Sequence, residues 1–241
     1  MNLIIDVGNT LVKFAIFNNG EIVYQNAVQT DQFDETIIKI KSYHHKIEKG
    51  IIASVGKPAQ EGFNFEKLKV PFLQLNHLLK FPFKNKYKTP KTLGVDRIAL
   101  VSSAAVNFPE SNVLIIDAGT CITYDFINKE NEYLGGAISP GLRLRYKSLN
   151  DFTLNLPLLS TQKPEAIIGA STVDSIHSGV VFGIINEIDA TILKYQQLYP
   201  DLTVILTGGD GDFLSKQLKN GIFANSNFLL EGLNFILEHN T

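Results

Sequence analysis

Two aspartates occupy the same local pattern at two places in the chain. Asp6 ends an apolar run and is followed by Val-Gly-Asn-Thr, and Asp117 ends a matching run and is followed by Ala-Gly-Thr-Cys. Carboxylates can hold a cation, while glycine turns and threonine hydroxyls can bind phosphate oxygens. The two motifs therefore suit a nucleotide phosphate chain with its cation. They predict phosphoryl transfer, which needs mainly positioning and charge neutralisation.

The two motifs are separated by 111 residues, close to half of the 241-residue chain. Each copy predicts a buried strand, a tight turn, a second strand, another turn and a third strand. A single Asp-x-Gly is explained by turn capping alone, but two copies after matched Leu-Ile-Ile runs argue against that explanation. We therefore expect two similar domains, residues 1–109 and residues 110–241, that face each other across a shared cleft.

A kinase also needs a base for the acceptor hydroxyl, and Asp96 in Gly-Val-Asp-Arg is the candidate. It stands at the start of a predicted helix, where the helix dipole favours a carboxylate. The neighbouring Arg97 offers a planar fork to an acceptor carboxylate or carbonyl. The alternative is a capping aspartate followed by a surface arginine, and this motif alone favours the alternative. Lys13 could likewise reach a phosphate or be an ordinary exposed lysine of a strand.

Other motifs are weaker or absent. A short apolar strand at residues 204–207 runs into Gly-Gly-Asp-Gly, where a flat ligand could lie against bare backbone, but such loops are common. The chain contains no Gly-x-x-x-x-Gly-Lys-Ser/Thr, no Gly-x-Gly-x-x-Gly after a strand, no His-Glu-x-x-His and no Gly-x-Ser-x-Gly. These absences argue against a P-loop enzyme, a dinucleotide site, a zinc protease and a serine hydrolase of the usual kinds.

Composition excludes several further classes. The chain is 44% apolar and 19% charged with a net charge of −2, so nucleic acid and anionic membrane are not favoured partners. The lysines at 80, 84, 86, 88 and 91 are interpreted as a solvated face. Cys121 is the single cysteine, which precludes an intrachain disulfide and favours the cytoplasm. An early carboxylate argues against a signal peptide, and no uncharged run approaches the ~20 residues of a membrane span.

The remaining elements follow from periodicity and breakers. Helices are expected from about Thr30 to Gly50 and over residues 96–108, 172–199 and 212–219, and strands over residues 51–55 and 72–75. Gly179 and Gly183 share one side of the longest helix. They would permit close packing, either within the monomer or against a second subunit.

Taken together, these residues resemble the type III pantothenate kinases of the acetate and sugar kinase/Hsp70/actin superfamily. The resemblance covers nearly the whole chain and rests on residues 6–10, 94–97, 117–120 with Thr123, 135–141, 171–172 and 178–179. It implies an α/β fold of two ribonuclease-H-like (actin-like ATPase) domains, each a mixed five-stranded sheet flanked by helices, with ATP between them. It also implies transfer of the γ-phosphoryl group to pantothenate, the first step of coenzyme A synthesis, by a cytoplasmic homodimer.

The resemblance also implies roles for residues. The first phosphate loop would comprise Asp6, Val7, Gly8, Asn9, Thr10, Leu11, Val12 and Lys13, with Asp6 near Mg²⁺ through a water. Asp117 would hold K⁺ or NH₄⁺, Thr120 would contact ATP, and Asp96 would be the general base. Pantothenate would be bound by Tyr87, Gly94, Val95, Asp96, Arg97 and Thr172. Ile98 departs from the aromatic residue that many members carry after Gly-x-Asp-Arg.

Two other functions remain open. A non-catalytic ATP-binding regulator of the same fold would keep Asp6 and Asp117 but would not need Asp96. A kinase for another small hydroxyl or carboxylate substrate would share every phosphate motif and differ only in the acceptor residues. The complete acceptor motif favours the enzyme.

Overall fold

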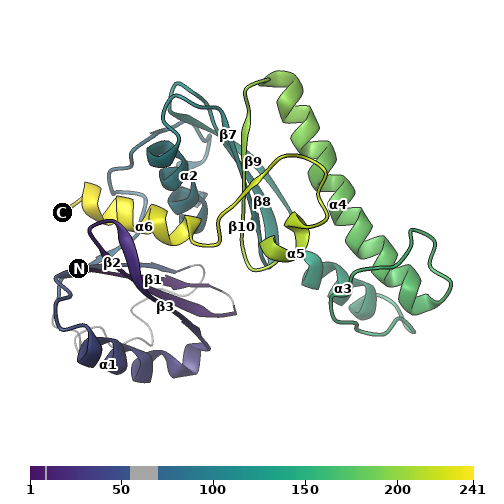
Figure 1. Ribbon diagram of the computed structural model, residues 1–241, viewed down its shortest axis with the longest axis horizontal. Helices are drawn as coiled ribbons and strands as arrows, with labels where there is room; N and C mark the ends of the chain where they lie inside the picture. Colours follow the sequence, from purple (N-terminus) through teal and green to yellow (C-terminus); the bar gives the residue numbers. More distant parts are fainter. Residues whose placement is uncertain (9, 55–69) are drawn as a thin grey trace. The chain divides into compact units, whose positions relative to one another are not determined.

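The computed structural model describes residues 1–8, 10–54 and 70–241, which form two compact units. The first unit comprises Met1–Pro109 together with Asn227–Thr241, and the second comprises Glu110–Ser226. Figure 1 shows the elements of both units along the colour-coded chain. The division after Pro109 coincides with the expected domain boundary. The assignment of all of residues 110–241 to the second domain is wrong, because the last helix packs within the first unit.

The first unit is built on a mixed sheet in the order β3-β2-β1-β4-β5. Its strands are β1 (Asn2–Val7), β2 (Val12–Asn18), β3 (Glu21–Val28), β4 (Lys49–Ser54) and β5 (Phe72–Gln74). The first three strands pair antiparallel, and β4 and β5 continue the sheet in parallel from β1. The unit also contains β6 (Lys84–Asn85), the 3-10 turns Thr30–Gln32 and Pro90–Thr92, and the helices α1 (Phe33–Tyr43) and α2 (Val95–Asn107).

The second unit repeats this strand order. Its strands are β7 (Val113–Ala118), β8 (Cys121–Ile127), β9 (Glu132–Pro140), β10 (Thr203–Thr207) and β11 (Phe223–Ala224), and they follow one another across the sheet as β11-β10-β7-β8-β9. Its helices are α3 (Leu142–Asp151), α4 (Thr172–Leu198) and α5 (Gly211–Ser215). The strand, turn, strand, turn, strand pattern expected for each half is therefore confirmed, and so is the mixed α/β class.

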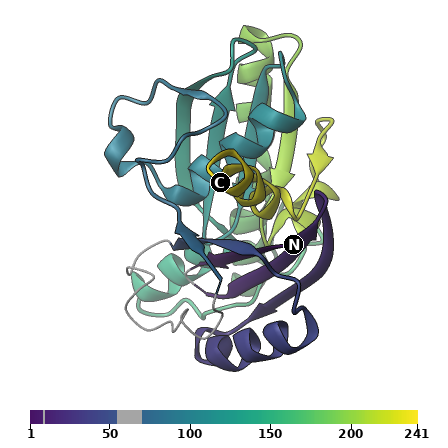
Figure 2. The same cartoon turned by 90° about the vertical axis from the view of Figure 1, so that its left-hand side faces the viewer.

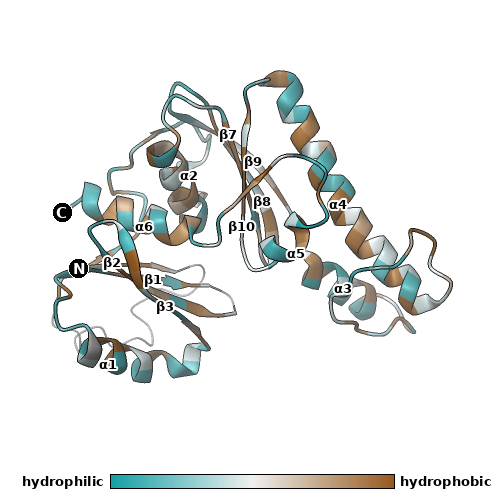
Figure 3. Ribbon diagram, viewed as in Figure 1, coloured by the Kyte–Doolittle hydropathy of each residue, from teal (hydrophilic) through white to brown (hydrophobic). Residues whose placement is uncertain are grey.

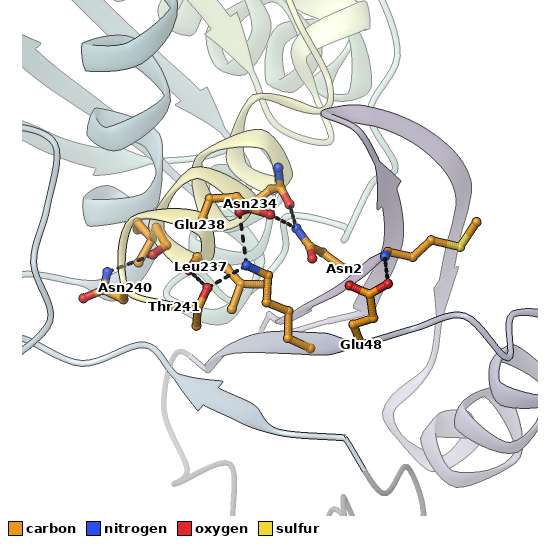
Figure 4. A network of polar contacts seen from close by, with 10 residues as sticks. Asn2, Glu48, Asn234, Leu237, Glu238, Asn240 and Thr241 are labelled. Atoms are coloured by element: carbon orange, nitrogen blue, oxygen red, sulfur yellow. Dashed lines mark hydrogen bonds and ion pairs between the residues drawn. The ribbon is translucent and has the colours of Figure 1, made fainter.

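The C-terminal helix α6 (Phe228–His239) belongs to the first unit because it is fastened there by apolar and polar contacts. It lies against α2, as Figure 2 shows, and a side chain at Gly232 would collide with the Ala99 carbonyl of α2. Asn2 donates hydrogen bonds to Asn234 and Glu238 (Figure 4), and the Lys49 ammonium lies 3.1 Å from the Glu238 carboxylate. The chain therefore returns to its first half after completing the second, and local sequence gives no sign of this.

The longest helix, α4, has the length and composition of a membrane span, but half of the relevant window is buried inside the protein. Polar and apolar residues alternate along it in the hydropathy colouring of Figure 3. Its apolar stripe packs on the sheet of the second unit. The buried members of this stripe are Ile176, Val180, Val181, Ile184, Ile185, Ile188 and Ile192. The helix is therefore a core helix of this unit.

Some expected element ends are wrong. The first helix ends at Tyr43, because the backbone from Lys49 onward pairs with β1 as strand β4, so Gly50 lies inside a strand. The helix expected over residues 212–219 is the short α5, which ends at Ser215. Val55, the expected end of β4, lies outside the described residues. Helices α3 and α6 were not expected from the sequence.

Candidate functional site

The turn between β1 and β2 brings together the residues expected to form the first phosphate loop. Asp6 lies directly opposite Lys13 in the antiparallel pair, so their side chains share one face of the sheet. The Gly8 N–H donates to the Leu11 carbonyl over 3.1 Å and closes the turn. Val7 ends β1, Val12 begins β2, and Thr10 is exposed between them. Asn9 lies outside the described residues.

Asp6 is buried with 5% of its surface exposed, and burial raises the pKa of its carboxyl from 3.8 to about 6. The positive charge of Lys13 acts in the opposite direction, which makes Lys13 more than an ordinary exposed strand lysine. The negative charge of Asp96 raises the Asp6 pKa further. Two carboxylates far apart in the sequence therefore interact within one unit, and a cation near them would relieve an unfavourable negative charge.

Asp96 stands in the first turn of α2, one residue after the first helical position, and Gly94 is the N-cap residue. The Asp96 carboxylate accepts a hydrogen bond from the Arg97 N–H over 2.8 Å. A Cβ on residue 94 would lie 2.3 Å from the Asp96 Oδ1 atom, so only glycine leaves room for the carboxylate in this position. The structure therefore holds Asp96 at the helix start without making it the N-cap.

Arg97 is buried, with 5% of its surface exposed, so the alternative of a surface arginine is wrong. Its guanidinium carbon lies 5.6 Å from the centroid of the Tyr87 ring, in the range of a cation–π contact. The Tyr87 N–H is held by the Asn85 side chain over 2.9 Å. The structure thus places the expected acceptor residues of the first unit, from Tyr87 to Arg97, around one helix N-terminus.

In the second unit, Asp117 lies near the end of β7, and the turn that follows is one residue shorter than its counterpart in the first unit. The Gly119 N–H donates to the Cys121 carbonyl over 3.0 Å, and Ala118 already pairs with Ile122. Thr120 is exposed at the tip of this turn. The internal duplication is therefore close in the strands and inexact in the phosphate-type turns.

The Gly-Gly loop after β10 lies directly against Asp117. Gly208 has a φ of +94°, and a Cβ there would lie 2.4 Å from both the Asp117 Oδ1 atom and the Ala118 carbonyl oxygen. The Asp210 N–H donates to the same carbonyl over 2.9 Å. Glycine at 208 is thus required by backbone conformation and by the space that the carboxylate occupies. The sequence of this loop looks ordinary because its contact with Asp117 is not local.

Thr123 lies directly opposite Asp117 in the β7–β8 pair, on the same face of the sheet. Its side-chain hydroxyl oxygen is buried and has no hydrogen-bond partner among the described residues. A buried hydroxyl without a partner costs free energy unless a ligand or ion occupies the site. Asp117, Thr123 and the cradle left by Gly208 therefore fit a cation that accepts oxygen ligands.

Thr172 begins α4, where the Ser171 side chain caps the helix by accepting the Asp174 N–H over 3.1 Å. Thr172 lines a cavity of about 700 Å³ in the second unit. The wall of this cavity is mainly apolar with a few hydroxyl groups and one guanidinium. The remaining lining residues are Arg145, Ser148, Leu149, Leu156, Ser175, Ile176, Gly179 and Val180. Thr172 therefore belongs to a different unit from Tyr87 and Arg97, and their joint action on one substrate stays a prediction.

The described residues offer few protein ligands for a metal ion. No group of three or more His, Cys, Asp or Glu side chains in this part of the chain is arranged to hold a metal ion. Mg²⁺ at nucleotide sites is usually held by one or two carboxylates plus phosphate oxygens, so this finding fits a metal that arrives with a nucleotide. The lysines at positions 80, 84, 86, 88 and 91 are all exposed, which agrees with a solvated face.

Comparison with known proteins supplies the family context. The family model for type III pantothenate kinase matches residues 2–194. A type III pantothenate kinase of Christiangramia forsetii is 51% identical over 240 residues, which cover 100% of this chain and 99% of the relative. Among solved structures, a Campylobacter jejuni protein assigned to the Baf family of transcriptional activators aligns with a TM-score of 0.62 at 24% identity and covers 98% of this chain and 97% of its own. A glucokinase from an Antarctic psychrotroph aligns with a TM-score of 0.53 at 12% identity over 98% of each chain. At these sequence identities, the two structural similarities show only that this chain shares its fold with those proteins.

Proposed function

The chain belongs to the type III pantothenate kinase family, and from this premise we propose how its residues carry out the reaction. The enzyme is a kinase that uses ATP to phosphorylate pantothenate in coenzyme A synthesis. The observation that carries the residue assignment is the interaction of Asp6 with Asp96 beside the buried Arg97. This interaction supports a division of roles in which Asp6 lies near the phosphates of ATP and Asp96 lies near the acceptor hydroxyl.

The reaction assigns a separate task to each residue of this arrangement. Asp96 accepts the proton of the pantothenate hydroxyl as the oxygen attacks the γ-phosphorus of ATP. A new O–P bond forms, the bond between the γ-phosphorus and the bridging oxygen breaks, and ADP leaves with the electron pair. Arg97 binds the substrate carboxylate while Tyr87 fixes the guanidinium plane, and Lys13 with the backbone of the first turn binds phosphate oxygens. Mg²⁺, when bound near Asp6, neutralises charge on the phosphates.

We assign the monovalent cation to Asp117, with Thr123 as a second oxygen ligand. The support is the buried hydroxyl of Thr123 beside Asp117, which has no hydrogen-bond partner within residues 1–8, 10–54 and 70–241, and the space that glycine leaves at position 208. The exposed hydroxyl of Thr120 would contact the nucleotide from the same turn. K⁺ or NH₄⁺ suits this site because neither ion needs the near-ideal octahedral shell that Mg²⁺ demands.

The deciding measurement is ADP release from the purified protein with Mg²⁺-ATP and pantothenate. We expect turnover that depends on pantothenate and is strongly reduced when Na⁺ replaces K⁺ and NH₄⁺. ATP hydrolysis without acceptor should be slow. Turnover that appears only with a different small hydroxyl compound would favour the alternative substrate, and ATP binding with no turnover on any acceptor would favour the regulator.

Replacement of Thr123 tests the cation site. Thr123→Val removes the hydroxyl at almost constant volume, so we expect the K⁺ concentration for half-maximal activity to rise by about tenfold, since outer or weak metal contacts are typically worth ~10–100-fold. Thr123→Ser should restore most of the wild-type response. The measurement is a K⁺ titration of turnover at saturating ATP and pantothenate. An unchanged titration in Thr123→Val would remove Thr123 from the site.

We also propose that the enzyme is a cytoplasmic homodimer that packs through α4. A Cβ at Gly179 would meet nothing within 4 Å, and one at Gly183 would approach only an arginine side-chain atom at 3.8 Å. The described residues therefore place no close neighbour against these glycines, which supports the alternative of packing against a second subunit. Sedimentation of the purified protein tests this assignment directly.

A further inference from the structure

Arg145, on helix α3, makes three polar contacts through its side chain, and none of its partners is among the expected site residues. Its Nε atom donates to the Pro140 carbonyl over 2.9 Å, and its Nη2 atom donates to the Ser139 hydroxyl over 2.9 Å. The same Nη2 atom pairs with the Glu187 carboxylate of α4 over 2.5 Å, and both side chains are mostly buried, with 22% and 30% of their surfaces exposed. The guanidinium therefore ties α3 and α4 to the end of strand β9.

Glu187 is held from a second direction by strand β8. The Tyr124 hydroxyl donates to the other Glu187 oxygen over 2.9 Å. Burial alone would raise the pKa of Glu187, but hydrogen bonds from Arg145, Ser139 and Tyr124 outweigh it and lower that pKa. Glu187 therefore stays ionised at neutral pH and holds Arg145 in one orientation.

The segment fixed by Arg145 forms one wall of the second phosphate-type turn. Pro140 pairs with Cys121, and the Gly141 N–H donates to the Thr120 carbonyl over 3.1 Å. A Cβ at Gly141 would lie 2.1 Å from the Gly119 carbonyl oxygen, so the two backbone segments are in direct contact. Any movement of residues 139–141 would therefore displace the Thr120 turn.

We propose that Arg145 and Glu187 are positioning residues that hold the Thr120 turn in the geometry needed to bind ATP. The proposal rests on the proposed function, because it assigns this turn to the nucleotide. Neither side chain touches the reacting atoms; the effect passes through Ser139, Pro140 and Gly141. The planar fork of arginine matters here because it reaches a carbonyl, a hydroxyl and a carboxylate at once, which the point charge of a lysine cannot do.

A competing role for Arg145 is direct binding of a substrate carboxylate, because Arg145 also lines the cavity that contains Thr172. The contacts argue against this role. Its charge is neutralised by Glu187, and two of its N–H groups are directed to β9. The two roles predict different kinetic effects: positioning of the turn affects ATP, whereas direct binding affects pantothenate.

The test compares Arg145→Met, Arg145→Lys and Glu187→Gln with a matched control on the same helix. Arg143 is exposed on α3, so Arg143→Met removes the same charge and side-chain length without touching β9. We expect Arg145→Met to weaken Mg²⁺-ATP binding by about 10–100-fold, in the range of supporting contacts around active sites. The Michaelis constant for pantothenate should stay within about twofold, and Arg143→Met should behave as wild type. Glu187→Gln should weaken ATP binding in the same direction, and Arg145→Lys should recover only part of the loss.

Binding of ATP is measured by calorimetry as well as by kinetics, so the result does not depend on turnover. A wild-type protein that binds ATP but does not phosphorylate pantothenate would contradict the proposed function and leave this test usable. If Arg145→Met does not fold, Ser139→Ala removes a single contact of the guanidinium and should weaken ATP binding severalfold. Unchanged ATP affinity in folded variants, or an effect confined to pantothenate, would overturn the positioning role.

Discussion

Asp96→Asn should retain Mg²⁺-ATP binding and lose about 10²–10⁴-fold in turnover, the range of a positioned general base. Asparagine keeps the size of the side chain and can still accept the Arg97 N–H, which donates to the carboxylate over 2.8 Å. It also keeps the space that Gly94 leaves for this side chain. The substitution therefore removes the ability to accept a proton and leaves the local geometry nearly intact.

The matched control for this variant is Asp34→Asn. Asp34 also lies in the first turn of a helix of the same unit, α1, so its replacement reproduces the loss of a favourable charge near a helix N-terminus. That loss should cost only ~0.3–1 kcal/mol of stability and leave turnover unchanged. If Asp96→Asn turned over pantothenate at the wild-type rate, Asp96 would have no part in proton transfer.

The acceptor motif shows where sequence reasoning succeeds and where it stops. Residues 94–97 are adjacent in the chain, so their position at a helix start could be predicted from the glycine, the aspartate and the apolar spacing that follows. The burial of Arg97 under Tyr87 and the interaction of Asp96 with Asp6 could not. Both depend on how the helix packs against a sheet that is built from distant residues.

The same distinction holds for the fold. The two strand, turn and strand units were predictable because each consists of an apolar run interrupted by a glycine turn. The return of α6 to the first unit depends on contacts such as that between Asn2 and Asn234, at opposite ends of the chain. No local pattern carries this information, and an even division of the chain by its internal repeat therefore placed α6 in the wrong half.

The second site contains a further non-local feature. The Gly-Gly loop after β10 has an ordinary sequence, and its importance becomes clear only because Gly208 lies against Asp117. Thr123 was part of the motif, but the absence of a hydrogen-bond partner for its hydroxyl among the described residues is a property of the folded unit. The sequence pattern could therefore point to positions 123 and 208, but it could not show why a threonine and a glycine are needed there.

Asp6→Asn should strongly reduce turnover and, at the same time, make the ligand-free protein more stable at neutral pH. Loss of the carboxylate should lower turnover by ~10³-fold, because charge stabilisation by a metal is worth several kcal/mol and each 1.36 kcal/mol is a factor of ten. The gain in stability follows from burial, which raises the pKa of Asp6 from 3.8 to about 6. Ionised Asp6 therefore opposes folding when no cation is present.

The direction in which the free energy of unfolding changes with pH distinguishes the effect of a buried charge from the simple loss of a contact. Between pH 4 and pH 6 the folded wild-type protein retains a proton on Asp6 that the unfolded chain has lost, since the folded pKa is about 6 and the reference value 3.8. The Asp6 contribution to the free energy of unfolding therefore falls as pH rises through this window, by up to about 3 kcal/mol, and stays low above it. Asp6→Asn lacks this titration, so the two proteins should differ little near pH 4 and most above pH 6.

Thermal unfolding of both proteins from pH 4 to pH 8, without Mg²⁺ and with a chelator, measures the difference. The variant should unfold several degrees above the wild type at pH 7.5, and added Mg²⁺-ATP should stabilise the wild type far more than the variant. Asp34→Asn is the control, because it removes an exposed carboxylate of the same unit that lies outside the proposed site. It should leave both the pH dependence of unfolding and the response to Mg²⁺-ATP unchanged. A variant of Asp6 that is less stable than the wild type at pH 7.5 would mean that contacts of the carboxylate outweigh its burial, and the buried charge would then not be what a bound cation relieves.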